Sequence, residues 1–215
     1  MPNRSPSFSL AVVLLAAGAS SRMGKPKMLL PWGQNTILGH LIDVWKKVGA
    51  EQIAVVYAER DGALNAELDR LAFPQENRIT NPDPARGMFG SIQCAAQWKG
   101  WRSGLTHWAI ALGDQPHLPS SLLRSLLDFV RKRPQKICQP SRNARPRHPV
   151  LLPAAVFRKL ATSNDQNLKQ FLERMSADVE LIEMDDPSLD LDLDTPTDYE
   201  KARQAFLGSQ PRCEG

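Results

Sequence analysis

Short runs of apolar residues alternate with helical patterns along the chain. Mainly apolar runs at 9–14, 52–57 and 106–112 predict three buried strands, and residues 78–80 are a shorter strand candidate. Between these runs, apolar residues recur at the spacing of one helix face. Buried strands that alternate with helices are typical of a sheet covered on both faces. The pattern therefore predicts an α/β fold with a mainly parallel sheet in a single Rossmann-like domain.

The helices of this pattern have recognisable ends. Ile37, Leu41 and Val44 share one face of a helix expected over 36–48, and Gly49 ends it as a C-terminal cap would. Further helices are expected at 62–72, 89–98, 120–130, 164–174 and 196–206. The residues placed to cap or begin the last three are Ser120 or Ser121, Asn164 or Asp165, and Pro196.

The pattern changes after residue 136. Short strands at 136–139, 148–152 and 179–184 surround a basic loop that prolines interrupt. This arrangement predicts a small antiparallel addition to the sheet. The expected organisation is a flexible leader at 1–7, one domain at 8–207 and a flexible tail at 208–215.

Composition favours a globular protein with a small anionic partner. With 215 residues, of which 42% are hydrophobic, the chain is long enough for one substantial core. The net charge is +4, but the basic residues are scattered, which favours a small anionic substrate over nucleic acid. Cys94, Cys138 and Cys213 are far apart and odd in number, as in a reducing compartment. No run approaches the ~20 apolar residues of a membrane span, so a cytoplasmic protein without a membrane partner is expected.

The first predicted strand leads directly into a loop of small and basic residues. Gly18 and Gly24 permit backbone angles that other residues resist, and Arg22 and Lys27 add positive charge beside the loop amides. A loop of amides and cations at the end of a strand suits a polyphosphate. The loop is not a Rossmann fingerprint, because five residues separate the glycines, and it is not a Walker P-loop, because no Ser or Thr follows the lysine.

A carboxylate follows the strand expected at 106–112. Asp114 lies in the turn Gly113-Asp114-Gln115-Pro116, where it can hold a divalent cation that bridges phosphate oxygens. A plain turn is the alternative, because Asp and Pro both favour turns.

A second acidic segment precedes the last helix. Alternation over 189–194 predicts that Asp190, Asp192 and Asp194 lie on one side of an extended segment and the leucines on the other. A metal ion is one natural compensation for such a carboxylate array. The alternative is an acidic edge strand in water, with Asp194 or Thr195 capping the helix.

Taken together, these motifs resemble the molybdenum cofactor nucleotidyltransferases, which have a Rossmann-like, nucleotide-diphospho-sugar transferase-like fold. Three motifs match in order over residues 15–199: Leu15-Ala16-Ala17-Gly18-x-Ser20-x-Arg22-Met23-Gly24-x-x-Lys27, then Gly113-Asp114-Gln115-Pro116, then Asp192-x-Asp194-Thr195-Pro196-x-Asp198-Tyr199. Segment 87–92 is similar to one that opens a helix beside the nucleotide. Ala17 and Gln115 resemble the cytidylyltransferase branch more than the guanylyltransferase branch.

The resemblance implies a reaction and a set of roles. CMP would pass from CTP, or another NTP, to the phosphate of molybdopterin, with Mg2+ as the cofactor and pyrophosphate as the product. Lys27 would contact the α-phosphate, and Arg22 the β- and γ-phosphates. Asp114 and Asp194 would bind Mg2+, with Asp192 a weaker candidate. The implied nucleotide-binding residues are Leu15, Ala16, Ala17, Gly18, Ser20, Arg22, Lys27, Asn81, Ser91 and Asp114.

The acceptor side of the resemblance lies near residue 148. Arg147-His148-Pro149-Val150-Leu151 is similar to a Gly-His-Pro segment on the pterin side of the family, which makes His148 and Arg147 the candidate acceptor ligands. Arg147 stands where the family usually has glycine, so the acceptor is open. Arg142 and Arg145 are expected to be solvated loop cations. A structural role for His148 is an equal alternative.

Other functions are also open at this point. GTP as the donor, or a sugar or polyol phosphate as the acceptor, would keep the same chemistry. A non-catalytic module could instead bind nucleotide or the molybdenum cofactor and deliver the cofactor to a recipient molybdoenzyme. Trp98, Trp101 and Trp108, as exposed apolar candidates, motivate that alternative, although core packing is favoured for Trp108.

Overall fold

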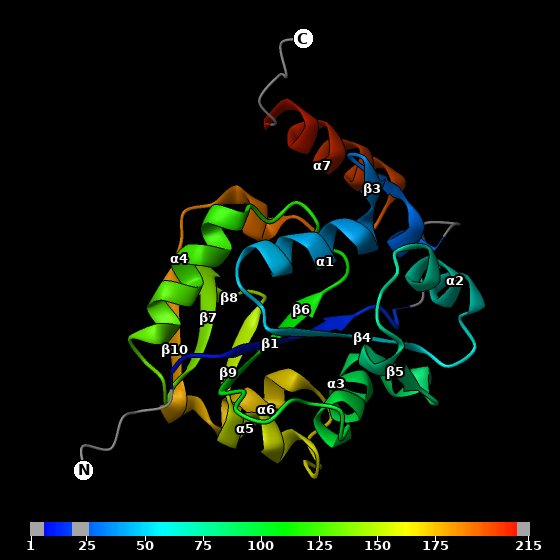
Figure 1. The fold of residues 1–215 in the computed structure, drawn as a ribbon. Coiled ribbons are helices and arrows are strands. Elements are labelled where there is room, and N and C mark those ends of the chain that lie inside the picture. Colours follow the sequence, from blue (N-terminus) through cyan, green and yellow to red (C-terminus); the bar gives the residue numbers. More distant parts are fainter. Residues whose placement is uncertain (1–6, 19–25, 210–215) are drawn as a thin grey trace.

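The computed structural model describes residues 7–18 and 26–209, which form a central sheet with helices on both faces (Figure 1). Its strands are β1 (Leu10–Leu15), β4 (Gln52–Ala58), β5 (Arg78–Asn81), β6 (His107–Leu112), β7 (Ile137–Arg142), β8 (Arg145–Pro146), β9 (Val150–Pro153) and β10 (Val179–Glu183). Their order is β10-β7-β9-β6-β1-β4-β5, with β8 paired to β7. The α/β class predicted from the sequence is confirmed.

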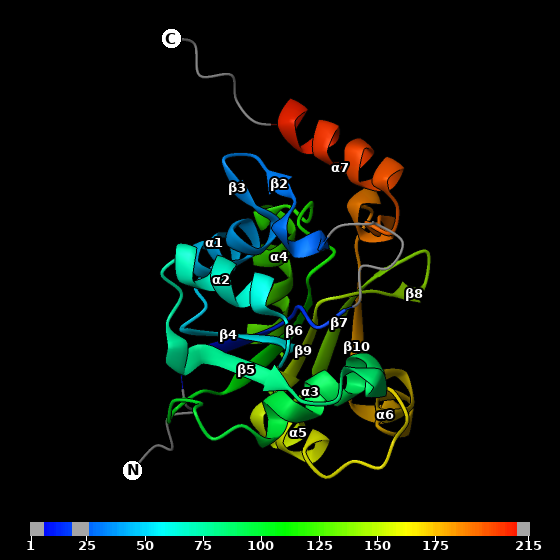
Figure 2. The ribbon, with the colours of Figure 1, turned by 90° about the vertical axis from the view of Figure 1, so that its right-hand side faces the viewer.

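Helices cover both faces of the sheet. They are α1 (Ile37–Lys47), α2 (Gly62–Arg70), α3 (Gly87–Gln97), α4 (Ser120–Arg131), α5 (Ala154–Leu160), α6 (Leu168–Arg174) and α7 (Pro196–Ser209). Figures 1 and 2 show α1, α2 and α4 on one face, with α7 beyond them, and α3, α5 and α6 on the other. A separate hairpin of β2 (Pro31–Trp32) and β3 (Asn35–Thr36) lies beside α7.

Strand β1 shows why the apolar runs are continuous. Leu10, Val12 and Leu14 pack into the core beneath α1 and α4, whereas the residues between them pack into the core beneath α3 and α5. Successive side chains of a strand point to opposite faces. Because helices cover both faces, every position of β1 is buried.

The antiparallel addition predicted after residue 136 is also confirmed. β9 runs antiparallel to both β6 and β7, while β10 is parallel to β7. β6 and β7 therefore run in the same direction. The chain that leaves β7 consequently emerges at the sheet edge where β6 also ends.

The predicted caps of two helices are wrong. α4 follows Pro119 without a side-chain cap, so neither Ser120 nor Ser121 has that role. α6 begins only after Asn167, whose Oδ1 accepts from the backbone of Gln170 at 2.9 Å.

Tertiary contacts explain the later start of α6. Gln93 of α3 donates to the Ser163 carbonyl at 2.8 Å, which holds the preceding segment against α3. Asp165 accepts instead from Ser163 and Arg174. Helix α5, which the sequence pattern did not predict, packs against the same part of α3.

Trp98, Trp101 and Trp108 form an aromatic cluster with Phe157 instead of an exposed surface. Trp108 is 5% exposed and stacks on Phe157, with ring centroids 4.8 Å apart. Trp101 meets Trp98, Trp108 and Phe157 edge to face. The expected core role of Trp108 is confirmed. The exposed apolar surface that motivated a cofactor-delivery module is not formed by this cluster.

We expect Phe157→Ala to lower the free energy of unfolding by about 3–5 kcal/mol, because it removes a 2% exposed ring from this cluster and leaves a cavity. Urea unfolding followed by tryptophan fluorescence measures the loss. Phe129→Ala is the matched control, because Phe129 is only partly buried and is covered by Arg133 on its outer face. Equal losses in the two variants would contradict the packing described here.

Helix length and the chain ends complete the picture. None of the described helices is long and apolar enough to cross a membrane. Most of the predicted leader and tail, at 1–7 and 208–215, lies outside the described residues. Helix α7 extends past residue 207 to Ser209.

Candidate functional site

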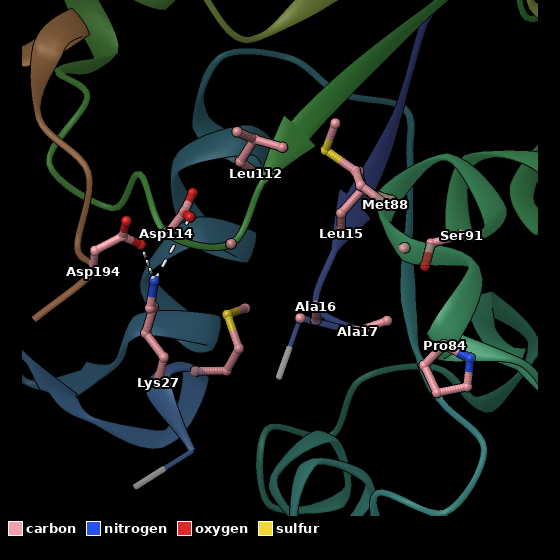
Figure 3. Close-up of a pocket in the computed structure, with 14 residues that line it drawn as sticks. Leu15, Ala16, Ala17, Lys27, Pro84, Met88, Ser91, Leu112, Asp114 and Asp194 are labelled. Atoms are coloured by element: carbon pink, nitrogen blue, oxygen red, sulfur yellow. Dashed lines mark ion pairs between the residues drawn. The ribbon is translucent and has the colours of Figure 1, made fainter. Parts of the chain in front are cut away.

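Two central strands of the sheet end level with each other at one edge. Leu15 at the end of β1 pairs with Leu112 at the end of β6, and both strands are parallel. Ligands bind at this carboxyl edge in open α/β sheets. A cavity of about 370 Å³ opens there (Figure 3). It is lined by Leu15, Ala16, Ala17, Gly18, Lys27, Met28, Pro84, Gly87, Met88, Ser91, Leu112, Gly113, Asp114 and Asp194.

Lys27 lies between two carboxylates from distant parts of the chain. Its Nζ is 3.7 Å from Oδ2 of Asp114 and 3.6 Å from Oδ1 of Asp194 (Figure 3). Lys27 begins the short 3-10 helix η1 (Lys27–Leu29), Asp114 follows β6, and Asp194 precedes α7. Asp114 and Asp194 thus face the same part of the cavity, where the Lys27 ammonium lies between them.

Gly113 brings Asp114 close to the end of β1. The Gly113 amide donates to the Leu15 carbonyl at 3.0 Å. A Cβ on Gly113 would lie 2.8 Å from that backbone oxygen and 2.5 Å from Sδ of Met28. Glycine is therefore required here by close approach. Among the described residues, nothing lies within 4 Å of a Cβ built on Gly18, and its backbone is not left-handed, so the predicted need for glycine is not seen there. Gly24 lies outside the described residues.

We expect Gly113→Ala to lower the free energy of unfolding by about 1–3 kcal/mol, because backbone must move to admit the methyl group. The same movement displaces Asp114, so turnover should fall at least tenfold, since an error of ~1 Å in the position of a reacting group is costly. Urea unfolding and steady-state kinetics measure the two effects. Gly62→Ala is the control, because a Cβ there meets nothing within 4 Å; a similar result for both glycines would refute the steric argument.

The acidic side of the cavity has the chemistry of a divalent cation site. Oδ1 of Asp114 is buried and has no hydrogen-bond partner among the residues that the structure describes. Burial, together with the charges of Asp114 and Asp194, raises the pKa of Asp192. Over residues 7–18 and 26–209, no group of three His, Cys, Asp or Glu side chains could hold a metal by itself. Mg2+ is commonly bound by one or two carboxylates plus substrate phosphates, and Asp114 with Asp194 fits that arrangement.

The opposite side of the cavity is formed by β1 and α3. Ala16, Ala17 and Ser91 all border the cavity in Figure 3. Asn81 is buried behind this surface and does not line the described cavity. Its Nδ2 donates to Oγ of Ser91 at 2.9 Å, so Asn81 orients Ser91 from behind.

Some site residues escape the sequence analysis, and some lie beyond the structure. Met88 follows the left-handed Gly87 at the start of α3 and is 43% exposed at the cavity. Met88 was named only as part of segment 87–92, whose resemblance was the available signal, and not as a site residue. Ser20 and Arg22, both predicted to bind the nucleotide, lie outside the described residues.

A second cavity, of about 320 Å³, shares Leu112 with the first. It is lined by Leu112, Gln115, Pro146, Arg147, His148, Leu189, Asp190 and Asp192. Nδ1 of His148 donates to the Ile110 carbonyl at 3.4 Å, so the other ring nitrogen is an acceptor. Burial lowers the pKa of His148, and the ring is therefore neutral near pH 7.

Asp190 joins two arginines at this second cavity. Its Oδ1 accepts from Nε and Nη2 of Arg147 at 3.0 and 2.6 Å, and its Oδ2 accepts from Nη1 of Arg142. These hydrogen bonds lower the pKa of Asp190. Arg142 was expected to be a solvated cation and Arg147 an acceptor ligand, yet both are engaged by Asp190 in this structure.

The strict alternation predicted for 189–194 is wrong. Leu189 and Leu193 are buried, but Leu191 is 40% exposed. The reason is the short 3-10 helix η5 (Pro187–Asp190), which interrupts the extended segment. Asp190 therefore contacts the arginines, while Asp194 contacts Lys27.

The N-terminus of α7 is capped by Thr195. Its Oγ1 accepts from the Asp198 amide at 3.2 Å, and Asp198 Oδ2 accepts from the Thr195 amide at 3.1 Å. This reciprocal pair is a capping box. Asp194 is not needed as the cap, which is consistent with its position at the cavity.

Comparison with known proteins identifies relatives of the whole fold. The family described as "MobA-like NTP transferase domain" matches residues 12–179. The molybdenum cofactor cytidylyltransferase of Escherichia coli K12 is 29% identical over 90% of this chain and 95% of its own. A probable molybdenum cofactor guanylyltransferase of Carboxydothermus hydrogenoformans is 30% identical over 56% of this chain and 54% of its own. Rv0371c of Mycobacterium tuberculosis H37Rv, crystallised in complex with manganese, superposes with a TM-score of 0.63 at 25% identity, covering 92% of this chain and 98% of that one.

Proposed function

The chain belongs to the MobA-like NTP transferase domain family and is a nucleotidyltransferase, and from that premise we propose that it transfers CMP from CTP to the phosphate of molybdopterin. The similarity to a molybdenum cofactor cytidylyltransferase over nearly the full length of both chains supports this donor and acceptor. Ala17 and Gln115, which resemble the cytidylyl branch, also support CTP.

One observation carries the proposal. Asp114 and Asp194 converge on Lys27 at the carboxyl edge of the sheet, beside a cavity bordered by the chain that leaves β1. A nucleoside triphosphate is the ligand that needs both parts, because its phosphates require cations while its sugar and base require a wider pocket. We place the base and ribose between the Ala16–Gly18 backbone and Ser91, and the phosphates toward Lys27.

The proposed reaction requires positioning and charge neutralisation from the protein. An oxygen of the acceptor phosphate attacks the α-phosphorus, a new P–O bond forms in line, and the bond to the β-phosphate breaks to release pyrophosphate. Lys27 stabilises the charge that grows on the α-phosphate. Asp114 and Asp194 would hold Mg2+, which supplies charge neutralisation across the phosphates when bound. Arg22 would hold the leaving group through its forked donors.

The second cavity is the proposed acceptor site. It adjoins the first at Leu112, so a phosphate bound there would lie next to the phosphates of the donor. His148 offers an uncharged hydrogen-bond acceptor, and Arg147 supplies positive charge at the rim. A recipient molybdoenzyme would then receive the product.

Pyrophosphate release tests this proposal. Each of the four NTPs is supplied with and without molybdopterin and Mg2+. We expect release only when CTP, molybdopterin and Mg2+ are all present. Binding of CTP without any pyrophosphate would rule out the proposed reaction.

GTP is the second candidate donor. The similarity to a probable molybdenum cofactor guanylyltransferase favours it. Release of pyrophosphate from GTP at a higher kcat/KM than from CTP would decide for the guanylyl reaction. A sugar phosphate or polyol phosphate that replaces molybdopterin in the same assay would change the acceptor and leave the chemistry intact.

A further inference from the structure

We propose that Asp190 is a positioning residue, which Arg142 and Arg147 hold so that the segment 191–194 presents Asp194 to the cation site opposite Asp114. The inference rests on the proposed divalent cation at Asp114 and Asp194. Asp190 is not one of the proposed cation ligands, because it lies at the second cavity. Its proposed role is to hold Asp194 in place.

Asp194 needs such a device because its segment has little regular structure. Residues 191–194 belong to no helix or strand, and the Asp194 side chain is 52% exposed. Leu193 anchors the segment in the core on one side. On the other side, the anchors are Leu189, Asp190 and a contact of 3.0 Å between Nε2 of His117 and the Ser188 carbonyl.

The hydrogen bonds of Asp190 hold its side chain in place from two sides. Both of its oxygens are used, and the forked guanidinium of Arg147 gives two of the hydrogen bonds. Arg142 ends β7 and Arg147 precedes β9, so Asp190 fastens η5 to both arms of this hairpin. The side chains are 23–33% exposed, which shields the cluster partly from water.

Arg147 and Asp190 carry opposite charges, so a change at each residue tests the proposal differently. Removing the positive charge of Arg147 would strengthen the binding of a cation nearby if only long-range electrostatics mattered. If Arg147 acts through Asp190, its removal instead weakens cation binding. Asp190→Asn weakens cation binding under both explanations, so Arg147→Gln is the decisive variant.

The experiment measures Mn2+ affinity by electron paramagnetic resonance, with and without CTP. We expect Arg147→Gln and Asp190→Asn each to weaken Mn2+ binding about five- to tenfold, and the double variant to be no weaker than either single one. Arg147→Lys keeps the charge and part of the contact, so it should recover part of the affinity. Asp185→Asn is the control, because Asp185 meets Arg142 at 3.5 Å but is 97% exposed. Circular dichroism and thermal unfolding verify that each variant is folded.

Several outcomes would overturn the inference. They are unchanged or tighter Mn2+ binding in Arg147→Gln, an equal loss in Asp185→Asn, or no Mn2+ binding by the wild-type protein in either condition. An increase in the acceptor KM with Mn2+ affinity unchanged would also overturn it, because it would limit Arg147 to the proposed acceptor site. Mn2+ binding needs no turnover. If the wild-type protein released no pyrophosphate, the proposed function would be wrong, but the measured Mn2+ affinities would still test the role of Asp190.

Discussion

Alanine at position 27 is expected to lower kcat with CTP by about 10²- to 10³-fold while the melting temperature changes little. The Lys27 side chain is only 14% exposed, so water cannot easily replace its ammonium where charge develops on the α-phosphate. Stability should change little, because both ion pairs of Lys27 are long, at 3.7 and 3.6 Å, and solvent screens their carboxylates, which are 31% exposed in Asp114 and 52% in Asp194. Single-turnover pyrophosphate release and thermal unfolding measure the two effects.

Lys136→Ala is the matched control for this variant. Lys136 also forms an ion pair, with Asp178 at 3.9 Å, but it lies just before β7, at the sheet edge opposite the cavity. It should leave kcat unchanged. If Lys27→Ala kept a near wild-type rate with CTP, the proposed role of Lys27 at the α-phosphate would be wrong.

Asparagine at position 114 is expected to abolish metal-dependent activity, with a loss of at least ~10²-fold that added Mg2+ does not restore. The substitution keeps the shape of the side chain but removes the charge beside Lys27. It also replaces one of the two carboxylate oxygens with an amide NH2 group, which has no lone pair to offer a hard cation. Initial rates over a wide range of Mg2+ concentration measure the effect.

A chelator provides the complementary test. EDTA should stop pyrophosphate release by the wild-type protein, and excess Mg2+ should restore it. Asp128→Asn, an exposed carboxylate paired with Arg131 on α4, should behave as wild type in both assays. Full activity of the wild-type protein in the chelator would rule out the proposed metal.

The fold was predictable because its signals are local. β1 is an uninterrupted apolar run whose residues alternate between two cores, and α1 shows its face through Ile37 and Leu41. The convergence of Asp114 with Asp194 could also be anticipated, since the resemblance implied that both lie at one site. Their roles in metal binding stay predictions.

The features that sequence reasoning missed depend on contacts between distant residues. Asp190 meets Arg142 from 48 positions away, and no local pattern distinguishes it from Asp192 or Asp194. Likewise, the start of α6 depends on Gln93, which lies on a different helix. The position of Asn81 behind Ser91 depends on how β5 packs against α3, which no local pattern indicates.

The reversal of β9 has a consequence for how this scaffold can diversify. Because β9 returns antiparallel between β6 and β7, the turn at 143–149 lies at the sheet edge that holds the cavity without interrupting η1, which begins at Lys27, or the turn after β6, which holds Asp114. Under the proposed function, insertions or exchanges that keep Arg147 would alter the shape offered to an acceptor without displacing Lys27 or Asp114. If the second cavity binds the acceptor as proposed, we expect a hairpin grafted from a homologue, with Arg142 and Arg147 kept, to change acceptor preference while donor preference is retained.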